Sequence, residues 1–384
     1  MAHRIPFTRV ARHPTKSQLV FANGSEFLVV DSTSGNLVRP YTGERKQTYT
    51  EQHKSIGFSK DGSLMATSGD NKQINVYDTN TWDLKLSRTA VKRVNALGFD
   101  EAGKIVVADK FGDVYCHPVE EQKEGEDAKM APIVGHVSMV TDMALTPGDK
   151  FVVTSDRDEH IRVSHYPNGY NIETFCLGHT DVVTCIKVVP WNGDVLVSAG
   201  GDGSLRTWKY LQGQQLSNLD IKQYIKQYTP EATDANSVDP IVASLALEEN
   251  YKLLAVAFAK TPAILLLRWN DESKGFDYDC TLETPDPVLD ICFDNKGLLW
   301  ATLAPSNESN ALVTAFEYKE NKMVQVPSDD ARVSKINAAE AGLVDTMPDL
   351  YSIFGLRKFL DLPEPLQAPA EKNRPKNKKR KVAE

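Results

Sequence analysis

Short stretches of alternating apolar and polar residues, separated by turns rich in Gly, Asp or Asn, recur along most of the chain. Alternation with a period of two predicts half-buried β-strands, and short strands at even spacing predict an all-β fold. The clearest block runs from Gly178-His179 to Tyr210, and a second runs from Gly135-His136 to Tyr166. The two Gly-His pairs lie 43 residues apart, so a structural unit of about that length repeats.

Five weaker blocks fit the same frame, at residues 19–38, 55–78, 95–116, 244–269 and 289–318. Seven units of about 40 to 45 residues are typical of WD repeats, in which each unit is one four-stranded blade. We therefore predict an all-β fold, a seven-bladed WD-repeat β-propeller. Because such rings are usually closed by a strand from one terminus that completes the blade at the other, we expect Phe7 to Ala11 to be the closing strand.

Two segments interrupt the pattern and set the expected domain boundaries. Residues 217–240 are too long and polar for a blade connection and predict an exposed loop with a short helical turn. From about residue 320 the alternation stops, so we assign residues 1–320 to the propeller and 321–384 to a C-terminal extension. Within it, 334–345 and 350–361 indicate short helical or irregular pieces, and a disordered or partly helical basic tail follows.

The block at 178–210 carries a complete set of polar residues: His179, Ser198, Asp202 and Trp208. WD repeats place these residue types in a buried His–Ser–Asp–Trp hydrogen-bond chain, and His136 opens the same pattern one block earlier. A Ser/His/Asp set is also the composition of a hydrolase triad. No G-x-S-x-G elbow accompanies it, so we interpret the set as structural.

Composition and charge narrow the class of protein. The formal net charge is −8, but residues 371–384 contribute +5, which leaves −13 on residues 1–370. The five cysteines are widely spaced without a C-x-x-C pair, which argues against a disulfide framework and a zinc site. No apolar run approaches the roughly 20 residues that span a bilayer, and the first residues lack an apolar signal core. We expect a soluble intracellular protein without membrane association.

The turn between the two best blocks differs from its own repeat. Gly201-Asp202-Gly203 in one block aligns with Arg157-Asp158-Glu159 in the other, although glycine suits such a turn better than a charged residue. In the strand that follows, alternation places His160 and Arg162 on one side, and Ser164 stands where the other block has Trp208. We expect Arg157, Glu159, His160 and Arg162 to form a compact charged patch. It is either a solvated cluster, in which Glu159 pairs with Arg162, or a docking patch for a charged partner.

Two motifs in this region resemble a known family. The SDRDEHIR motif, Ser155 to Arg162, and the ETFCLGH motif, Glu173 to His179, are similar to the distinctive segment of the wuho-type WD-repeat proteins, the non-catalytic subunits of tRNA (guanine-N7) methyltransferase. The similarity is strong over about residues 135–210. The PDLYSIFGLRK segment and the basic tail are also in keeping with the family, whereas the blocks at 244–318 are too degenerate to test it.

The resemblance implies a heterodimer. In that family the propeller binds a Rossmann-like subunit that holds S-adenosylmethionine and methylates N7 of a guanosine in the tRNA variable loop. This chain has no Gly-rich strand-to-helix loop, so we expect it to bind no cofactor and to be no enzyme itself. The family's contact motif falls on Arg157, Asp158, Glu159, His160 and Arg162. Asp158 is expected to keep the structural role of Asp202, whereas Glu159 and Arg162 are expected to contact the catalytic subunit.

The C-terminal basic residues carry a separate hypothesis. Direct contact with tRNA or nuclear import, which are compatible, is expected from Arg357, Lys358, Lys372, Arg374, Lys376, Lys378, Lys379, Arg380 and Lys381. The PKNKKRK segment is similar to a nuclear localisation signal, so we expect the protein in the nucleus, with a cytoplasmic pool as a further location. A solubilising end without either role is the alternative.

Two other classes of function stay open. A WD-repeat scaffold with a different partner, such as a ubiquitin-ligase substrate receptor, has the same blade pattern. A propeller hydrolase or lyase would need histidines or carboxylates converging from several blades, and the eight histidines of this chain are scattered.

Overall fold

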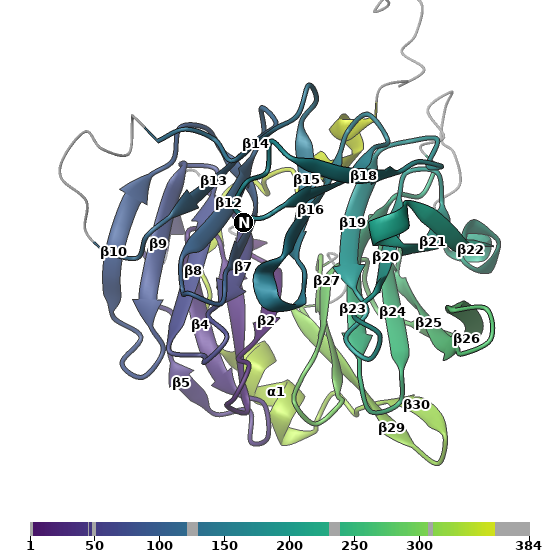
Figure 1. Ribbon diagram of the computed structural model, residues 1–384. Coiled ribbons are helices and arrows are strands. Elements are labelled where there is room, and N and C mark those ends of the chain that lie inside the picture. The colour runs from purple at the N-terminus through teal and green to yellow at the C-terminus, as the bar shows by residue number, and fades with distance from the viewer. Residues whose placement is uncertain are drawn as a thin grey trace, which may run out of the picture.

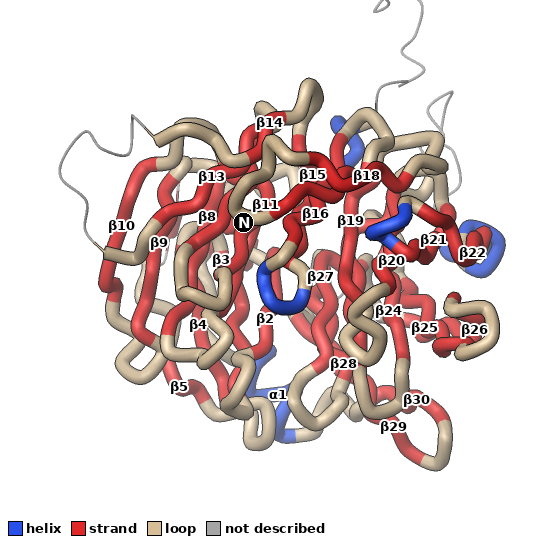
Figure 2. Tube along the Cα trace, in the orientation of Figure 1, coloured by secondary structure: helices blue, strands red, loops and turns tan. Residues whose placement is uncertain are grey.

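The structure is a computed structural model that describes residues 3–44, 46–47, 51–120, 130–229, 239–305 and 310–357. The described chain forms seven antiparallel four-stranded sheets and one small three-stranded sheet. The four-stranded sheets stand side by side around a central channel (Figure 1). Each innermost strand contacts that of the next sheet, and β27 contacts β2, so the ring is closed. Strands dominate the described chain, with only short helical pieces between them (Figure 2). The predicted seven-bladed all-β propeller is confirmed.

Each sheet runs from an innermost to an outermost strand in chain order. The innermost strands are β2 (Phe7–Arg12), β7 (His53–Phe58), β11 (Val94–Phe99), β15 (Val140–Leu145), β19 (Val183–Val188), β23 (Val242–Glu248) and β27 (Val288–Phe293). The second strands are β3 (Gln18–Asn23), β8 (Leu64–Gly69), β12 (Ile105–Asp109), β16 (Phe151–Asp156), β20 (Val195–Gly200), β24 (Leu253–Phe258) and β28 (Leu299–Leu303).

The outer half of each sheet follows the same order. The third strands are β4 (Glu26–Asp31), β9 (Gln73–Asp78), β13 (Asp113–His117), β17 (Ile161–His165), β21 (Ser204–Lys209), β25 (Ala263–Asn270) and β29 (Val313–Lys319). The outermost strands are β5 (Leu37–Arg39), β10 (Leu84–Thr89), β14 (Val134–Gly135), β18 (Ile172–Cys176), β22 (Gln214–Asp220), β26 (Gly275–Glu283) and β30 (Lys322–Gln325).

The second strands hold the core because both of their faces pack against neighbouring sheets. β20 and β24, with the sequences VLVSAG and LLAVAF, are buried at every position. A strand buried on both faces has an apolar run rather than strict alternation. The outermost strands, such as β18, are mostly exposed and keep polar residues among their apolar ones.

A repeated irregularity shapes the wall of the channel. In all seven innermost strands the pairing register shifts between the first and third residues, as between Val140 and Asp142. Side chains at these positions then bond to the next sheet. Asn95 donates to the carbonyl of Val140, Thr141 to that of Val183 and Thr184 to that of Val242, while Asp142 accepts from the amide of Ile186 and Asp290 from that of Val10. These bonds hold adjacent sheets in register.

The closure of the ring differs from the expectation. β2 pairs with β3 as the innermost strand of the first sheet, and the seventh sheet has four strands of its own, ending with β30 beyond residue 320. The strand Phe7 to Ala11 therefore does not complete the last blade. Packing closes the ring instead: Phe21 meets Trp300 edge to face at 6.4 Å between ring centroids in a core shared by the two sheets.

Part of the C-terminal extension belongs to the propeller. Helix α1 (Ala331–Ala338), capped by Asp330, buries Val333 and Ile336 in the core between the seventh and first sheets. β31 (Leu343–Val344) then pairs with β1 (His3–Arg4) and with β6 (Lys46–Gln47), so the two ends of the described chain meet in one small sheet. The short 3₁₀ helix η6 (Ser352–Leu356) follows.

The segment expected as an exposed loop at 217–240 is partly built into the fold. Its first residues complete β22, and the 3₁₀ turns η4 (Lys222–Tyr224) and η5 (Lys226–Tyr228) follow. Ile221 and Ile225 beside these turns are buried between the fifth and sixth sheets. Residues 230–238 lie outside the described chain. Two further 3₁₀ turns are η2 (Pro147–Asp149) and η3 (Tyr210–Gln212).

The five cysteines are free in the structure. In the described ranges, no helix is both long and apolar enough to cross a membrane.

Candidate partner-docking site

The polar network predicted for the block at 178–210 is present in the fifth sheet. His179 forms hydrogen bonds through Nδ1 with Asp202 (2.9 Å) and through Nε2 with Ser198 (2.7 Å), and the indole of Trp208 donates to Ser198 (2.8 Å). Burial opposes ionisation of Asp202, but hydrogen bonds from His179 and Ser204 hold its carboxyl pKa far below the ordinary value. The network fixes the loop before β19 on the turn between β20 and β21, so its role is structural.

The fourth sheet uses a different aspartate from the one expected. His136 bonds to Asp156 (3.1 Å) and to Thr154 (2.6 Å), so Asp156 takes the place that the sequence assigned to Asp158. Asp156 is the last residue of β16, and its other oxygen accepts the amides of Asp158 and His160. An aspartate at the strand end therefore holds both the histidine and the turn, and the structural role expected of Asp158 is wrong.

A signal for Asp156 exists elsewhere in the sequence. In the third sheet Asp109 ends β12 in the same way and accepts the amides of Phe111, Gly112 and Asp113. Comparison of ADKFGD with SDRDEH, rather than with GGDGS, would have identified this aspartate.

Glu159 occupies the one position of this turn that demands a left-handed backbone. Its φ is 74°, and the aligned residue of the fifth sheet, Gly203, has a φ of 66°. A residue with a Cβ pays of the order of 1 kcal/mol for this conformation, and glycine does not. The turn thus holds a glutamate where its own geometry favours glycine. The next residue, His160, has a side chain that is 48% exposed and lies 3.3 Å from Asp156.

Arg162 is buried, which corrects its place in the expected charged patch. The residue is 8% exposed, and its guanidinium donates to Ser164 Oγ (2.8 Å) and to the carbonyls of Gly135 (2.8 Å) and Gly169 (2.7 Å). Burial lowers its pKa. Because Ser164 replaces the tryptophan of the fifth sheet, the guanidinium has room to lie inside the blade. Arg162 therefore supports the docking region from within and is not presented to a partner.

Arg157 and Arg357 hold the C-terminal segment against the propeller. Arg157 donates to the carbonyls of Leu356 (2.7 Å) and Arg357 (3.2 Å). Arg357 is 8% exposed and donates to Gly201 (2.7 Å) and Asp239 (2.7 Å), with Asp181 3.0 Å away. We call residues 350–357 the C-terminal strap. Arg357 is an anchor of this strap, so its expected role in RNA contact is wrong. Lys358 and the basic residues from Lys372 to Lys381 lie outside the described residues.

The loops around the turn share one face of the ring, the upper face in Figure 1. Backbone hydrogen bonds link them in sequence: Lys110 to Arg93, His136 to Gly112, Arg157 to Met139 and Gly201 to Val182. The ladder pairs Ile161 with Cys176, so Leu177 lies beside His160. The turn is thus one part of a continuous surface.

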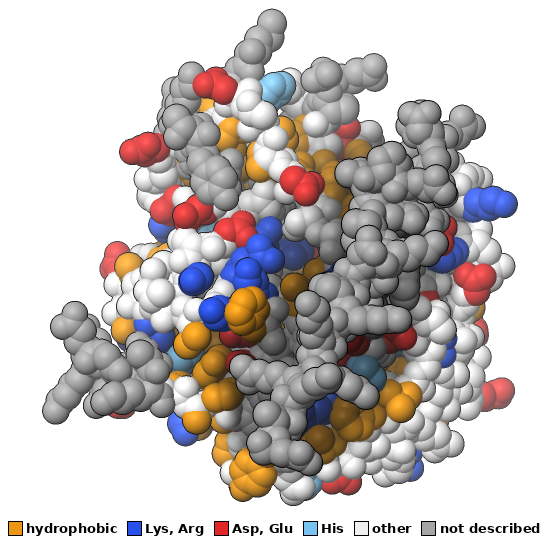
Figure 3. Space-filling model, turned by 90° about the horizontal axis from the view of Figure 1, so that it is seen from above, with side chains coloured by type: hydrophobic (Ala, Val, Ile, Leu, Met, Phe, Trp, Pro, Cys, Tyr) orange, Lys and Arg blue, Asp and Glu red, His pale blue; other side chains and the backbone are white. Residues whose placement is uncertain are grey.

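This surface carries exposed apolar side chains that the sequence reasoning missed. Phe111 is 57% exposed, Leu177 62%, and Val137 is fully exposed. The ammonium groups of Lys92 and Lys110 lie 4.5 Å and 5.5 Å from the centroid of the Phe111 ring. Seen from above, Lys and Arg side chains gather beside hydrophobic ones (Figure 3). We call Phe111, Val137, Glu159, His160 and Leu177 the docking face.

Comparison with known proteins places the chain. The family model described as the tRNA methyltransferase TRM82 WD40 domain matches residues 31–131 and 117–328. The tRNA (guanine-N(7)-)-methyltransferase non-catalytic subunit TRM82 of Meyerozyma guilliermondii is 29% identical over 327 residues, 77% of this chain and 74% of the relative. The non-catalytic subunit WDR4 of Homo sapiens is 35% identical over 63% of this chain and 57% of its own length. The WDR4 subunit of Mus musculus is 32% identical over 73% of this chain and 71% of its own length.

Solved structures confirm the architecture. The crystal structure of RRP9 WD40 repeats superposes with a TM-score of 0.64 at 18% identity, covering 79% of this chain and 88% of that one. The structure of U3-55K superposes with a TM-score of 0.63 at 18% identity, covering 79% of this chain and 89% of that one. At this identity the likeness supports the propeller fold alone. The match of the family model over most of the propeller goes further, and the chain belongs to the TRM82 WD40 family, whose named members are non-catalytic subunits of tRNA (guanine-N7) methyltransferase.

Proposed function

We propose that this chain is the non-catalytic subunit of a heterodimeric tRNA (guanine-N7) methyltransferase and that its docking face binds the catalytic subunit. Family membership carries the first part, because the relatives are named for that role. The second rests on the exposed apolar side chains that surround the turn, together with a glutamate that keeps a φ of 74° where glycine suits the backbone better.

The docking face has the composition of a protein interface. Phe111, Val137 and Leu177 are exposed apolar groups, and a cluster of such groups rimmed by charges is typical of a docking surface. Glu159 supplies charge at its edge and His160 adds a polar ring that is 48% exposed. Charge at the edge of an interface favours specificity and rapid association more than affinity. Asp156 holds the turn by accepting the amides of Asp158 and His160, and Arg162 holds the neighbouring loop at Gly135.

The division of labour follows from what each subunit contains. The sequence of this chain has no Gly-rich loop for a dinucleotide-like cofactor, so S-adenosylmethionine is assigned to the catalytic subunit. The propeller acts by stabilising that subunit and by helping to place the tRNA for methylation at N7 of a guanosine in the variable loop. The basic run from Lys372 to Lys381 is proposed to contact tRNA and to direct the protein to the nucleus.

A methyl-transfer assay tests the function. Unmodified tRNA transcript is incubated with S-adenosylmethionine and this chain alone, the catalytic subunit alone, or the two co-expressed. We expect no transfer from this chain and a strong gain from the pair over the catalytic subunit alone. Failure of the chains to co-purify, with no gain in activity, would contradict the proposal.

A charge reversal tests the docking face separately. Glu159→Lys should weaken binding of the catalytic subunit by at least about tenfold, because the partner's charges stay fixed. Glu320→Lys is the matched control, since Glu320 also has a positive φ (49°) but lies in the turn between β29 and β30 at the lower edge (Figure 1). If both variants bind like the wild type while the pair still methylates tRNA, the function stands and the docking face is wrong.

A further inference from the structure

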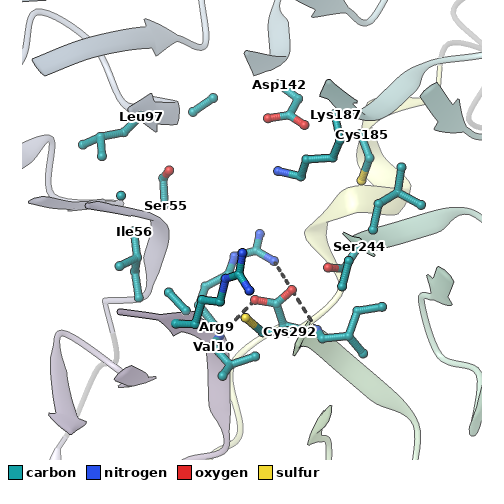
Figure 4. Close-up of a pocket in the computed structure, with 18 of the residues that line it drawn as sticks. Arg9, Val10, Ser55, Ile56, Leu97, Asp142, Cys185, Lys187, Ser244 and Cys292 are labelled. Carbon is teal, nitrogen blue, oxygen red and sulfur yellow. Dashed lines mark hydrogen bonds and ion pairs between the residues drawn. The ribbon is translucent and has the colours of Figure 1, made fainter. Parts of the chain in front are cut away.

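The central channel is a cavity of about 690 Å³ lined by residues of all seven innermost strands. Its size falls within the range of roughly 300 to 1,000 Å³ typical of small-molecule sites. The polar and charged side chains in Figure 4 project from several strands into the same space. The proposed docking of a catalytic subunit on the upper face makes no use of this cavity.

Five cations line the channel, namely Arg9, Arg12, Lys54, Lys60 and Lys187. Lys54 lies 3.8 Å from Asp70 and Lys60 lies 2.6 Å from Glu101, whereas Lys187 and Arg12 have no ion-pair partner in the described part of the chain. Lys187, the fifth residue of β19, points its ammonium into the open space (Figure 4) and has no carboxylate within 4.0 Å among the described residues. Arg12, the last residue of β2, is exposed in the same cavity and likewise has no described ion-pair partner. Arg9 is partly engaged, with Nη1 4.0 Å from Asp290 and Nε donating to the carbonyl of Lys54.

Arg9, Arg12 and Lys187 reach the cavity from two innermost strands of non-adjacent sheets, β2 and β19. Lys187 is surrounded by the channel wall, yet solvent reaches its side chain. The nearby carboxylate of Asp142 raises the pKa of Lys187, so the ammonium stays charged at neutral pH.

The two carboxylates in the wall are committed to the backbone. Asp142 accepts the amides of Met143 (2.8 Å) and Ile186 (2.9 Å), one with each oxygen. Asp290 accepts those of Ile291 (3.0 Å) and Val10 (3.0 Å) in the same way. These bonds fix the carboxylates as structural groups between sheets. They leave Lys187 and Arg12 as donors without a protein acceptor at hydrogen-bonding distance in the described chain.

This cationic interior contrasts with the rest of the molecule. Residues 1–370 carry a net charge of −13, so a cavity with exposed cations is a local exception within an acidic body. The lining holds five cations and two carboxylates, and a cleft with a net positive charge and low-dielectric walls concentrates anions. Ammonium and guanidinium groups together favour phosphate oxygens, to which both donate charge-assisted hydrogen bonds.

We propose that the central channel binds a small phosphate-bearing anion, with Lys187 and Arg12 as its principal donors and Arg9 as a third. The C-terminal strap lies near one end of the channel, since Leu350 to Ile353 line a small second cavity together with Arg9 and Lys54. We expect the ligand to enter from the end away from the strap, beyond the last residue of β2, where Arg12 and Pro14 line the cavity.

Calorimetric titration of the full-length chain with pyrophosphate tests the site, at constant ionic strength maintained with potassium chloride. We expect one pyrophosphate per chain and a rise in Tm on binding, because a ligand that binds the native state stabilises it. Lys187→Met and Arg12→Gln should each weaken binding by at least about tenfold. Lys209→Met, an exposed lysine at the end of β21 outside the channel, is the matched control and should bind like the wild type.

The design separates the channel from the basic tail, which every variant retains. Equal binding by the wild type and both channel variants would assign the anion to the tail or to the outer surface and overturn the proposal, and so would the absence of binding. Circular dichroism and Tm without ligand establish that each variant is folded. Lys187→Arg, which keeps the charge, should bind pyrophosphate and distinguishes a loss of charge from a loss of structure.

Discussion

At the scale of single residues, the turn from Arg157 to His160 holds a side chain that its backbone conformation disfavours. Glu159 takes a left-handed conformation, with a φ of 74°, at a position where the third and fifth sheets have Gly112 and Gly203 and the second sheet has Lys72 with a φ of 63°. Glycine adopts this region without a steric penalty, whereas a residue with a Cβ is strained there. Glu159 therefore carries a backbone strain that the sheets with glycine avoid, and stability and binding should respond to the removal of its side chain in opposite directions.

Glu159→Gly is expected to raise the free energy of unfolding by about 0.5 to 1 kcal/mol, because the strain is released, while weakening binding of the catalytic subunit. Denaturant unfolding and calorimetric titration with that subunit measure the two effects. Glu320→Gly, at a φ of 49°, should give a similar stabilisation with unchanged binding. A Glu159→Gly variant that binds like the wild type would remove Glu159 from the docking face.

The buried network of the fifth sheet makes stability depend on pH. Since the pKa of Asp202 lies below its unfolded value, its contribution is present above about pH 4 and is lost as the pH falls through the folded pKa. Asp202→Asn should cost about 1 to 3 kcal/mol at pH 7, and the difference from the wild type should shrink as the pH falls below 4. Denaturant unfolding at several pH values measures this, with Asp194→Asn, an exposed aspartate of the same sheet, as control.

Sequence reasoning identified some of these residues and misplaced others for physical reasons. The set His179, Ser198, Asp202 and Trp208 was predictable, because the motif spacing specifies it. The burial of Arg162 was not, since alternation gives the side of a strand but not whether that side has room. The room arises because Ser164 replaces a tryptophan. The acceptors for the guanidinium are the carbonyls of Gly135 and Gly169, which only the folded chain brings near.

At the scale of elements, the seven repeated sheets followed from local patterns and the contacts between distant segments did not. The strand at Phe7–Arg12 has the same alternation whether it opens the first sheet or completes the last one, so the pattern cannot choose between them. The C-terminal strap depends on Arg157 bonding to carbonyls some 200 residues away in the sequence. No periodicity within either segment reports such a contact.

Arg157→Gln is expected to loosen the strap, because it removes the donors to the carbonyls of Leu356 and Arg357. Amide hydrogen exchange in residues 352–357 should become faster, with a loss of about 1 to 2 kcal/mol in local stability. Arg206→Gln is the control, since Arg206 bonds to Ser204 and Gln215 within its own sheet. Unchanged exchange in Arg157→Gln would mean that Arg357 and apolar packing hold the strap without it.

At the scale of the whole molecule, charge is divided between an acidic body and a basic C-terminal run. Residues 1–370 carry −13 and residues 371–384 carry +5. An acidic surface repels the phosphates of RNA, so attraction to tRNA must come from local cations. Arg357, the last described residue, is fixed beside Asp181 and Gly201 on the upper face, which also carries the docking face. The chain beyond it therefore starts on the side proposed to hold the catalytic subunit.

Deleting residues 371–384 should lower the affinity of the methyltransferase pair for tRNA and reduce its salt dependence, while the two subunits remain associated. The binding constant falls as salt rises, and each phosphate contact adds about 0.7 to 0.9 to the steepness of log K against log salt. Removal of seven Lys and Arg residues should therefore make this dependence measurably less steep. Binding titrations at several salt concentrations give this slope, and gel filtration of the pair reports subunit association. A full-length variant with the seven cations replaced by glutamine separates charge from length. If affinity and slope are unchanged while the protein leaves the nucleus, the basic run directs import and does not touch tRNA.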